Sequence, residues 1–288
     1  MHEDLTERPR LREWSADVVQ WGPARNGIKR GVHLYAGGRS AWLRARGQVP
    51  AVPNIFTGSC PKSGSQWAKA LFDHEVVRRH TRLFTLPQLD YQKRAPRPFP
   101  RGTYVPGIYM SYDEFTAIPK PDGHRTVYVF RDPREIIVSS YFSAIETHRR
   151  IAGVDEVRAV VSAMPRDEGI HHCIDLMASR LREMASWVGV DDPAVATFRL
   201  EDIGAAPATQ VPLILEHCAV RLDASELDIL LEETSREALQ RKDLAKRPPG
   251  SESHYRVRRE SAAELLSPAH LAAIDAVVPG LTERLGYR

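Results

Sequence analysis

Residues 54–72 read NIFTGSCPKSGSQWAKALF, and this stretch decides the fold of the chain. The run 54–57 is typical of a buried strand, and the run 68–72 is typical of a helix. The turn between them holds Lys62 and Gly64. The backbone N–H groups of such a turn and the positive end of the following helix point to the same place, where Lys62 adds a full charge. The stretch therefore predicts an anion-binding loop between a strand and a helix, with a phosphate or a sulfate ester as its ligand.

This loop differs from the common nucleoside-triphosphate loop. That loop has two glycines five residues apart, followed by Lys and then by Ser or Thr. Here Lys62 precedes Gly64, which is the single glycine of residues 61–67. The ordinary ATPase or GTPase interpretation therefore fails. A Lys-Ser-Gly turn can also be purely structural, so the functional interpretation depends on a second motif.

The second motif lies at residues 124–139. Residues 124–130, HRTVYVF, form the kind of run that is typical of a central parallel strand buried on both faces. The run ends at RDPR (131–134), where the Asp-Pro pair indicates a turn before a helical pattern. The guanidinium of Arg131 is a rigid fork that suits phosphate, and Ser139 adds a hydroxyl donor on the helix. A second candidate phosphate anchor therefore follows a second strand.

Together the two motifs resemble those of sulfotransferases that use 3′-phosphoadenylyl sulfate (PAPS). In that family a Pro-Lys-Ser-Gly-x-x-Trp loop binds the 5′-phosphosulfate. A later strand leads into Arg-(Asn/Asp)-Pro-(Lys/Arg)-(Asp/Glu), with a Ser eight residues after the Arg, as from Arg131 to Ser139. The resemblance covers roughly residues 52–285 and weakens outside the two motifs. It implies an α/β, P-loop-like three-layer fold with a central parallel sheet of about five strands flanked by helices.

The resemblance also implies a set of nucleotide-binding residues. Trp67 would stack on the adenine, and Thr234-Ser235 match a pair on the adenine side, although they fit a plain helix N-cap equally well. The late Arg-Lys-Gly-x-x-Gly loop of the family falls on residues 254–259, where both glycines are missing, so the Arg that reaches the 3′-phosphate stays open. The implied residues are Lys62, Ser63, Gly64, Ser65, Gln66, Trp67, Arg131, Ser139, Thr234, Ser235, Arg256, Arg258 and Arg259.

The catalytic base is not fixed by the sequence. The resemblance aligns the Lys-Thr-His-Leu-Pro segment of the family with residues 107–111, which puts Tyr109 at the position of the catalytic His. A Tyr with an ordinary pKa near 10 is a poor base at pH 7. Gln66 replaces the second Thr of the family's loop, and Leu200 replaces its adenine-side aromatic residue. The other conceivable bases are His74, His80, Asp90, Asp113 and Glu114.

The implied reaction is the transfer of a sulfuryl group from PAPS to a hydroxyl or an amine of a small-molecule acceptor by in-line displacement. Adenosine 3′,5′-bisphosphate (PAP) is then the product, and Lys62 stabilises the charge on the bridging oxygen, so no metal is required. Two alternatives stay open: a PAP-binding protein that has lost catalysis, and a nucleotide-dependent phosphotransferase. The long segments 86–106 and 244–256, rich in Pro and charge, are the loops that could border the acceptor.

The composition indicates a globular protein that binds a small anion. The chain has 288 residues, of which 42% are hydrophobic and 27% are charged, with a net charge of +3. This mild basicity fits a small anionic ligand better than a nucleic acid. No segment approaches the ~20 apolar residues of a membrane helix, and the first residues lack the order of a secretion signal. We therefore expect a cytoplasmic protein without membrane insertion.

The chain divides into an N-terminal arm, residues 1–51, and a sulfotransferase-like α/β domain, residues 52–288. The arm is rich in Gly and Arg and contains scattered aromatic residues, whereas strand and helix patterns alternate in the domain, which predicts a parallel sheet covered on both faces. The three cysteines show no zinc or redox spacing, so no metal site is expected. Arg outnumbers Lys, which hints at a bacterial source, and homodimerisation is left open.

Overall fold

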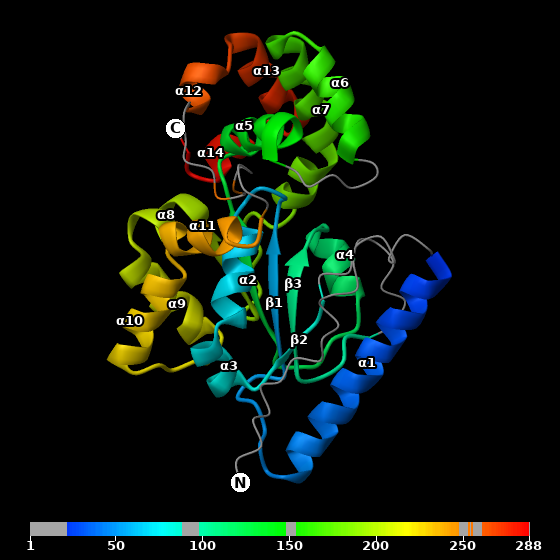
Figure 1. Ribbon diagram of the computed structural model, residues 1–288, viewed down its shortest axis with the longest axis vertical. Helices are drawn as coiled ribbons and strands as arrows, with labels where there is room; N and C mark the ends of the chain where they lie inside the picture. The colour runs from blue at the N-terminus through cyan, green and yellow to red at the C-terminus, as the bar shows by residue number, and fades with distance from the viewer. Residues whose placement is uncertain are drawn as a thin grey trace.

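The structure is a computed structural model that describes residues 22–87, 98–147, 154–247, 253, 255 and 261–287. Within this part of the chain one sheet has the strand order β2-β3-β1-β4-β5, and every neighbouring pair is parallel (Figure 1). The predicted central parallel sheet of about five strands is confirmed. The strands are β1 (Asn54–Ser59), β2 (Phe84–Thr85), β3 (Thr103–Ile108), β4 (Arg125–Phe130) and β5 (Val195–Arg199).

Helices cover both faces of this sheet, as the α/β prediction requires (Figure 1). On one face α2, α3, α8, α9 and α10 enclose an apolar cluster, and on the other face α1, α4, α5, α7 and α12 to α14 enclose a second one. The helices are α1 (Gly22–Ala45), α2 (Ser65–Asp73), α3 (Glu75–Thr81), α4 (Tyr112–Ala117), α5 (Pro133–Phe142), the π-helical turn η3 (Ser143–Thr147), α6 (Val154–Ala163), α7 (Arg166–Ala185), α8 (Leu200–Ala205), α9 (Pro207–His217), α10 (Ala224–Glu233), α11 (Arg236–Leu244), α12 (Ala262–Leu265), α13 (Pro268–Val277) and α14 (Leu281–Arg284).

Strand β4 shows how the sheet separates the two cores. Val127 and Val129 belong to the cluster on the α2 face, while Tyr128 and Phe130 belong to the cluster on the α5 face. Successive side chains of a strand point to opposite faces of the sheet, so a strand that is apolar throughout needs cover on both faces. The interpretation of this run as a central buried strand is confirmed.

The register of β1 against β4 places the two predicted phosphate motifs at the same edge of the sheet. Ser59, the last residue of β1, is in register with Val129, next to the last residue of β4. Because the strands are parallel, the loops that follow them leave the sheet side by side. Ligands of open α/β sheets bind in crevices at this carboxyl edge. The topology therefore brings the segments 60–64 and 131–134 together.

The described part of the expected N-terminal arm forms α1, which packs on the domain. Val32 and Ala36 of this helix lie in the same apolar cluster as the residues of the sheet. The ring of Tyr35 lies 5.2 Å from that of Phe84, in an edge-to-face arrangement. Residues 1–21 of the arm lie outside the described residues, and the domain boundary after residue 51 stays a prediction.

Candidate functional site

The loop between β1 and α2 is a tight turn with two residues in the left-handed region. Lys62 has φ +71° and Gly64, the N-cap of α2, has φ +85°. A Cβ atom on Gly64 would lie 2.6 Å from Cδ1 of Leu200, so this position requires glycine for its backbone and for its space. No side chain caps α2, which leaves the amide groups of its first turn for another acceptor. The predicted order of strand, tight turn and helix is confirmed, and the binding of an anion stays a prediction.

Ser63 presents a buried hydroxyl in this loop. The residue is 0% exposed, and its Oγ has no hydrogen-bond partner among the described residues. Its backbone N–H donates to the carbonyl of Cys60 at 3.1 Å, which closes the turn. Buried polar groups are nearly always hydrogen-bonded in folded proteins, so an unpaired one calls for an explanation. A polar ligand in the loop would supply the missing partner.

Lys62 lies beside the loop with its ammonium group largely withdrawn from water. Its Nζ donates to Oγ of Ser143, in η3, at 2.5 Å, and no carboxylate of the described residues forms an ion pair with it. The pKa of Lys62 is lowered from 10.5 to about 8, mainly by burial and in addition by the nearby charge of Arg131. Lys62 is therefore a largely buried cation that forms no ion pair with the described residues.

Arg131 joins the two motifs directly. Its Nη1 donates to the backbone carbonyl of Lys62 at 2.6 Å. Its Nη2 lies 3.5 Å from a carboxylate oxygen of Glu135, one turn along α5, and its Nε lies 4.0 Å from Glu201 at the start of α8. The side chain of Arg131 thus spans the space between the anion-binding loop and the carboxyl ends of β4 and β5. Two residues more than 60 positions apart become parts of one site.

Ser139 lies on α5 and is partly buried, but the serine that contacts Lys62 is Ser143, four residues later. Residues four apart lie on the same face of a helix, so the hydroxyl at position 143 follows the one at 139 along that face. The sequence analysis missed Ser143. The signal that could have found it is this second serine one turn after the family position.

The remaining loop residues lie at the start of α2. Ser65 begins the helix, Gln66 is exposed, and Trp67 is partly buried. The indole of Trp67 packs against the apolar cluster on the α2 face, which Leu200 also contacts. Stacking on an adenine stays a prediction for Trp67, and its contact with the core is what the structure shows.

The adenine-side pair forms local helix contacts. The hydroxyl of Thr234 donates to the carbonyl of Leu230 at 2.6 Å, and the hydroxyl of Ser235 accepts from the amide of Ala238 at 3.2 Å. Ser235 is the N-cap of α11, as the alternative interpretation expected. Arg256, Arg258 and Arg259, from the late loop, lie outside the described residues.

The structure separates the candidate bases. His74 follows the last residue of α2, at the end opposite to the loop, and its Nε2 lies 3.3 Å from Glu233. His80 pairs with Glu226 at 2.9 Å, also on the far side of α2. His74 is about one helix length of nine residues, roughly 13 Å, from the loop, and His80 lies on the next helix, α3. Both are therefore badly placed to act beside Lys62.

The carboxylate candidates and Tyr109 lie on another side of the site. Glu114 accepts from the amide of Ser111 in a capping box of α4, and Asp113 is exposed on the same helix. Tyr109 follows β3 directly, and its backbone carbonyl accepts from Nη1 of Arg180 at 3.2 Å. Tyr109 is thus at the carboxyl edge of the sheet that also carries Lys62. Asp90 lies outside the described residues.

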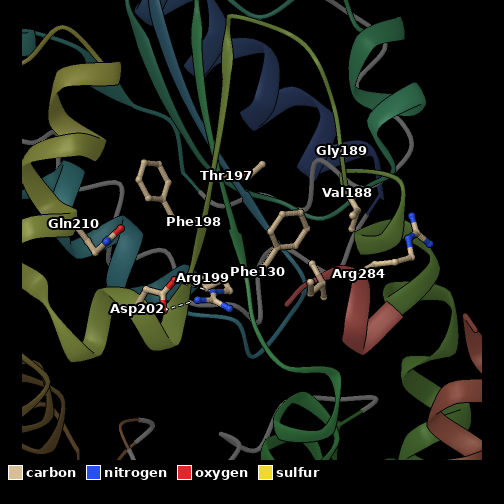
Figure 2. A pocket seen from close by; sticks show the side chains of 10 residues that line it. Phe130, Val188, Gly189, Thr197, Phe198, Arg199, Asp202, Gln210 and Arg284 are labelled. Atoms are coloured by element: carbon tan, nitrogen blue, oxygen red, sulfur yellow. Dashed lines mark hydrogen bonds and ion pairs between the residues drawn. The ribbon is translucent and has the colours of Figure 1, made fainter. Parts of the chain in front are cut away.

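Next to this site, a cavity of about 400 Å³ opens beside β5. Figure 2 shows it between Phe130, at the end of β4, Thr197 and Arg199 on β5, and Arg284 of α14, with Arg199 paired to Asp202. That ion pair is 2.7 Å long. None of the loop residues 61–67 lines this cavity. The loop 61–67 and the cavity are therefore neighbours rather than one pocket.

Among the described residues there is no group of three or more His, Cys, Asp or Glu side chains that could hold a metal ion. The same part of the chain contains no helix that is long and apolar enough to cross a membrane.

Cys60, next to the loop, is a buried residue of the core. Burial raises the pKa of its thiol well above the ordinary range, so the thiol is not a reactive one.

Comparisons with known proteins identify the fold. No protein-family model and no curated protein sequence matches the chain. A structure of retinol dehydratase in complex with androsterone and inactive cofactor PAP matches with a TM-score of 0.52 and 13% identity, over 81% of each chain. A structure of the mouse sulfotransferase SULT7A1 complexed with PAP matches with a TM-score of 0.49 and 14% identity, over 81% of this chain and 84% of that chain. The chain described here therefore has the fold of the retinol dehydratase structure.

Proposed function

We propose that this protein transfers a sulfuryl group from PAPS to a hydroxyl or an amine of a small-molecule acceptor. The observation that carries the proposal is the 2.6 Å contact from Arg131 Nη1 to the carbonyl of Lys62. The two motifs resemble the 5′-phosphosulfate loop and the 3′-phosphate anchor of PAPS-dependent sulfotransferases, and both must reach the same nucleotide. The fold shared with a PAP-bound structure supports the same ligand.

In the proposed reaction the acceptor attacks sulfur while the bond from sulfur to the bridging oxygen of the 5′-phosphate breaks. The electron pair of that bond stays on the phosphate of PAP, and the proton of the acceptor passes to a base. The ammonium group of Lys62 stabilises the charge that grows on the bridging oxygen. Ser143 holds that group in place through the 2.5 Å hydrogen bond. With a pKa of about 8, Lys62 is largely protonated at pH 7 and can serve as the donor.

The proposal assigns the other residues around this step. The hydroxyls of Ser63 and Ser65 and the amide of Gln66 hold the phosphosulfate oxygens, and Arg131 with Ser139 holds the 3′-phosphate. The base is sought at the carboxyl edge of the sheet, with Tyr109 as a candidate. No metal takes part, because Lys and Arg supply the positive charge. The proposed setting is the cytoplasm of a bacterium.

The first test is binding of PAP measured by isothermal titration calorimetry. Replacement of Arg131 by Ala removes a charge-assisted contact to the 3′-phosphate, which is worth about 1.5–3 kcal/mol, so the affinity should fall roughly ten- to a hundredfold. Arg125→Ala is the matched control, because Arg125 begins the strand that Arg131 follows and lies at its other end. Equal affinities for PAP in the wild type and in both variants would contradict the 3′-phosphate assignment.

The second test separates the proposal from its two alternatives. With labelled PAPS and a broad panel of phenols, alcohols and amines, Lys62→Ala should abolish transfer and leave the fold intact, as checked by circular dichroism. Tight binding of PAP without transfer to any acceptor would favour a protein that has lost catalysis. Displacement of PAP by ATP at equal concentrations would favour a phosphotransferase, since ATP has no 3′-phosphate.

A further inference from the structure

We propose that α1 is a membrane-surface helix, whose outer face adsorbs to anionic lipid while the helix lies parallel to the membrane. This inference is independent of the proposed function. It concerns a face of the molecule on the side of α1 that points away from the sheet (Figure 1).

The inner face of α1 attaches the helix firmly to the domain. Val32, Ala36, Ser40 and Leu43 are at most 5% exposed, and their spacing of three and four residues makes one stripe. Ser40 is packed closely against Gly102, where a Cβ atom would come within 2.8 Å of its hydroxyl. The helix is thus a fixed part of the body, and its opposite face has a defined orientation.

The outer face is a continuous exposed stripe of small and apolar residues. Residues three, four and seven apart share a helix face, and the stripe opposite to Val32 and Ala36 contains Leu34, which is 76% exposed. Trp42, at the border of the stripe, is 39% exposed, and Val49, just beyond the helix, is 59% exposed. The stripe consists of Gly31, Leu34, Gly38, Ala41 and Ala45, all of them exposed.

This stripe is open in the structure. No described atom outside the helix lies within 4 Å of a Cβ atom built on Gly31 or on Gly38. A single exposed Leu is ordinary on a protein surface, but here the exposed Leu34 lies on a stripe without any polar side chain, and the exposed Trp42 lies at its border. Such a stripe can lie flat against another apolar surface.

Charge decides what that surface is. From Val18 to Phe72 the chain contains no Asp and no Glu, so every full charge on α1 itself is positive. Arg30, Arg44 and Arg46 are exposed beside the stripe, and the guanidinium of Arg46 lies 4.1 Å from the centre of the Trp42 ring. Basic residues that flank an apolar stripe, with Trp at its border, are typical of helices that lie at a lipid interface.

A second copy of the chain is a poor occupant of the same face. Two α1 helices in contact would bring together rims that carry only Arg, and neither copy would offer a carboxylate to the other on this helix. Anionic headgroups supply the missing charge, while Leu34 and Trp42 reach the boundary of the acyl chains. The face therefore fits a lipid surface rich in anionic headgroups.

The test is co-sedimentation of the full chain with sucrose-loaded vesicles of phosphatidylcholine, with and without about one third phosphatidylserine. We expect binding to the phosphatidylserine vesicles to exceed binding to the neutral ones at least tenfold, and to fall in 0.5 M NaCl, because surface charges are screened. Leu34→Asp should reduce binding roughly tenfold or more. Leu271→Asp is the matched control, since Leu271 is also an exposed Leu of a helix, at 41%, but on α13, and it should bind like the wild type.

Leu34 is mostly exposed, so Leu34→Asp should keep the thermal midpoint of the wild type. A loss of vesicle binding would then result from the changed outer face of α1 and not from unfolding. Equal binding to both vesicle types, or binding that Leu34→Asp leaves unchanged, would overturn the proposal. A wild type that co-sediments with neither vesicle type would also overturn the proposal. A dimer in light scattering that Leu34→Asp dissociates, without vesicle binding, would assign the face to a second copy instead.

Discussion

Lys62 carries a burial penalty in the unliganded protein, and Lys62→Met should therefore stabilise it. The pKa of Lys62 is lowered from 10.5 to about 8, first by burial and then by Arg131. Below pH 8 the lysine is protonated in the folded and in the unfolded chain, and the folded state carries the whole penalty. Between pH 8 and 10.5 the folded chain has released this proton while the unfolded chain still holds it, so stability rises with pH. Above pH 10.5 the penalty has gone.

The magnitude follows from the shift and from one hydrogen bond. Each pKa unit corresponds to about 1.4 kcal/mol, so the penalty at pH 7.5 is about 3 kcal/mol. Methionine keeps the length of the side chain and removes the charge, but it also removes the hydrogen bond from Nζ to Ser143, which is worth about 1 kcal/mol. We expect Lys62→Met to be about 2 kcal/mol more stable than the wild type at pH 7.5 and about equal to it near pH 10.

The assay is urea unfolding of both proteins at several pH values from 7.5 to 10.5, followed by circular dichroism. The difference between the two proteins isolates Lys62, because all other titrating groups are shared. Lys246→Met is the control, since Lys246 is exposed and this change removes no buried charge. A Lys62→Met variant that is less stable than the wild type at pH 7.5, or a difference that stays constant up to pH 10.5, would refute the buried-charge reasoning.

Two further changes test the loop and its neighbours. Gly64→Ala forces alanine into the left-handed region, at a cost of about 1–2 kcal/mol, and also meets Leu200, so urea unfolding should show a larger loss than that. The double variant with Leu200→Ala should recover only the contact part, and full recovery would contradict the backbone argument. Glu201→Gln removes a carboxylate 4.0 Å from Arg131, and because exposed pairs are worth at most about 1 kcal/mol, PAP affinity should rise up to about fivefold by calorimetry. A fall in that affinity would mean that Glu201 supports the bound nucleotide.

The parts of the fold that could be predicted from sequence are those determined by residues close to one another along the chain. Strand β4 is apolar along its whole length and therefore indicates burial on both faces, and the Asp-Pro pair after it indicates the helix start that α5 shows. The positive φ of Gly64 follows from the turn that the loop must make. The end of α10 at Glu233 is also local in origin, because Ser235 caps a new helix, α11.

The contacts within the site could not be predicted in the same way, since they depend on side chains that meet across the fold. Ser143 reaches Lys62 from η3, and Glu201 reaches Arg131 from the start of α8. The sequence around each of these residues does not indicate that the two side chains of a pair come into contact. The catalytic base of the proposed reaction could not be assigned from sequence for the same reason. A base is identified by its distance to the bound acceptor, and that distance depends on how the chain folds around the acceptor.

The charges around the loop at residues 61–67 indicate what kind of ligand it would hold. The carboxylates of Glu135 and Glu201 lie near Arg131, at the end of the sheet that also holds Lys62. Lys62 makes no ion pair with the described residues, and the buried hydroxyl of Ser63 next to it lacks a partner. A doubly anionic group in the loop would give Lys62 a counter-charge and Ser63 a hydrogen-bond partner. A water molecule would supply only the hydrogen bond to Ser63. Among the described residues the ammonium group of Lys62 therefore has no anionic partner of its own, and a bound anion would supply one.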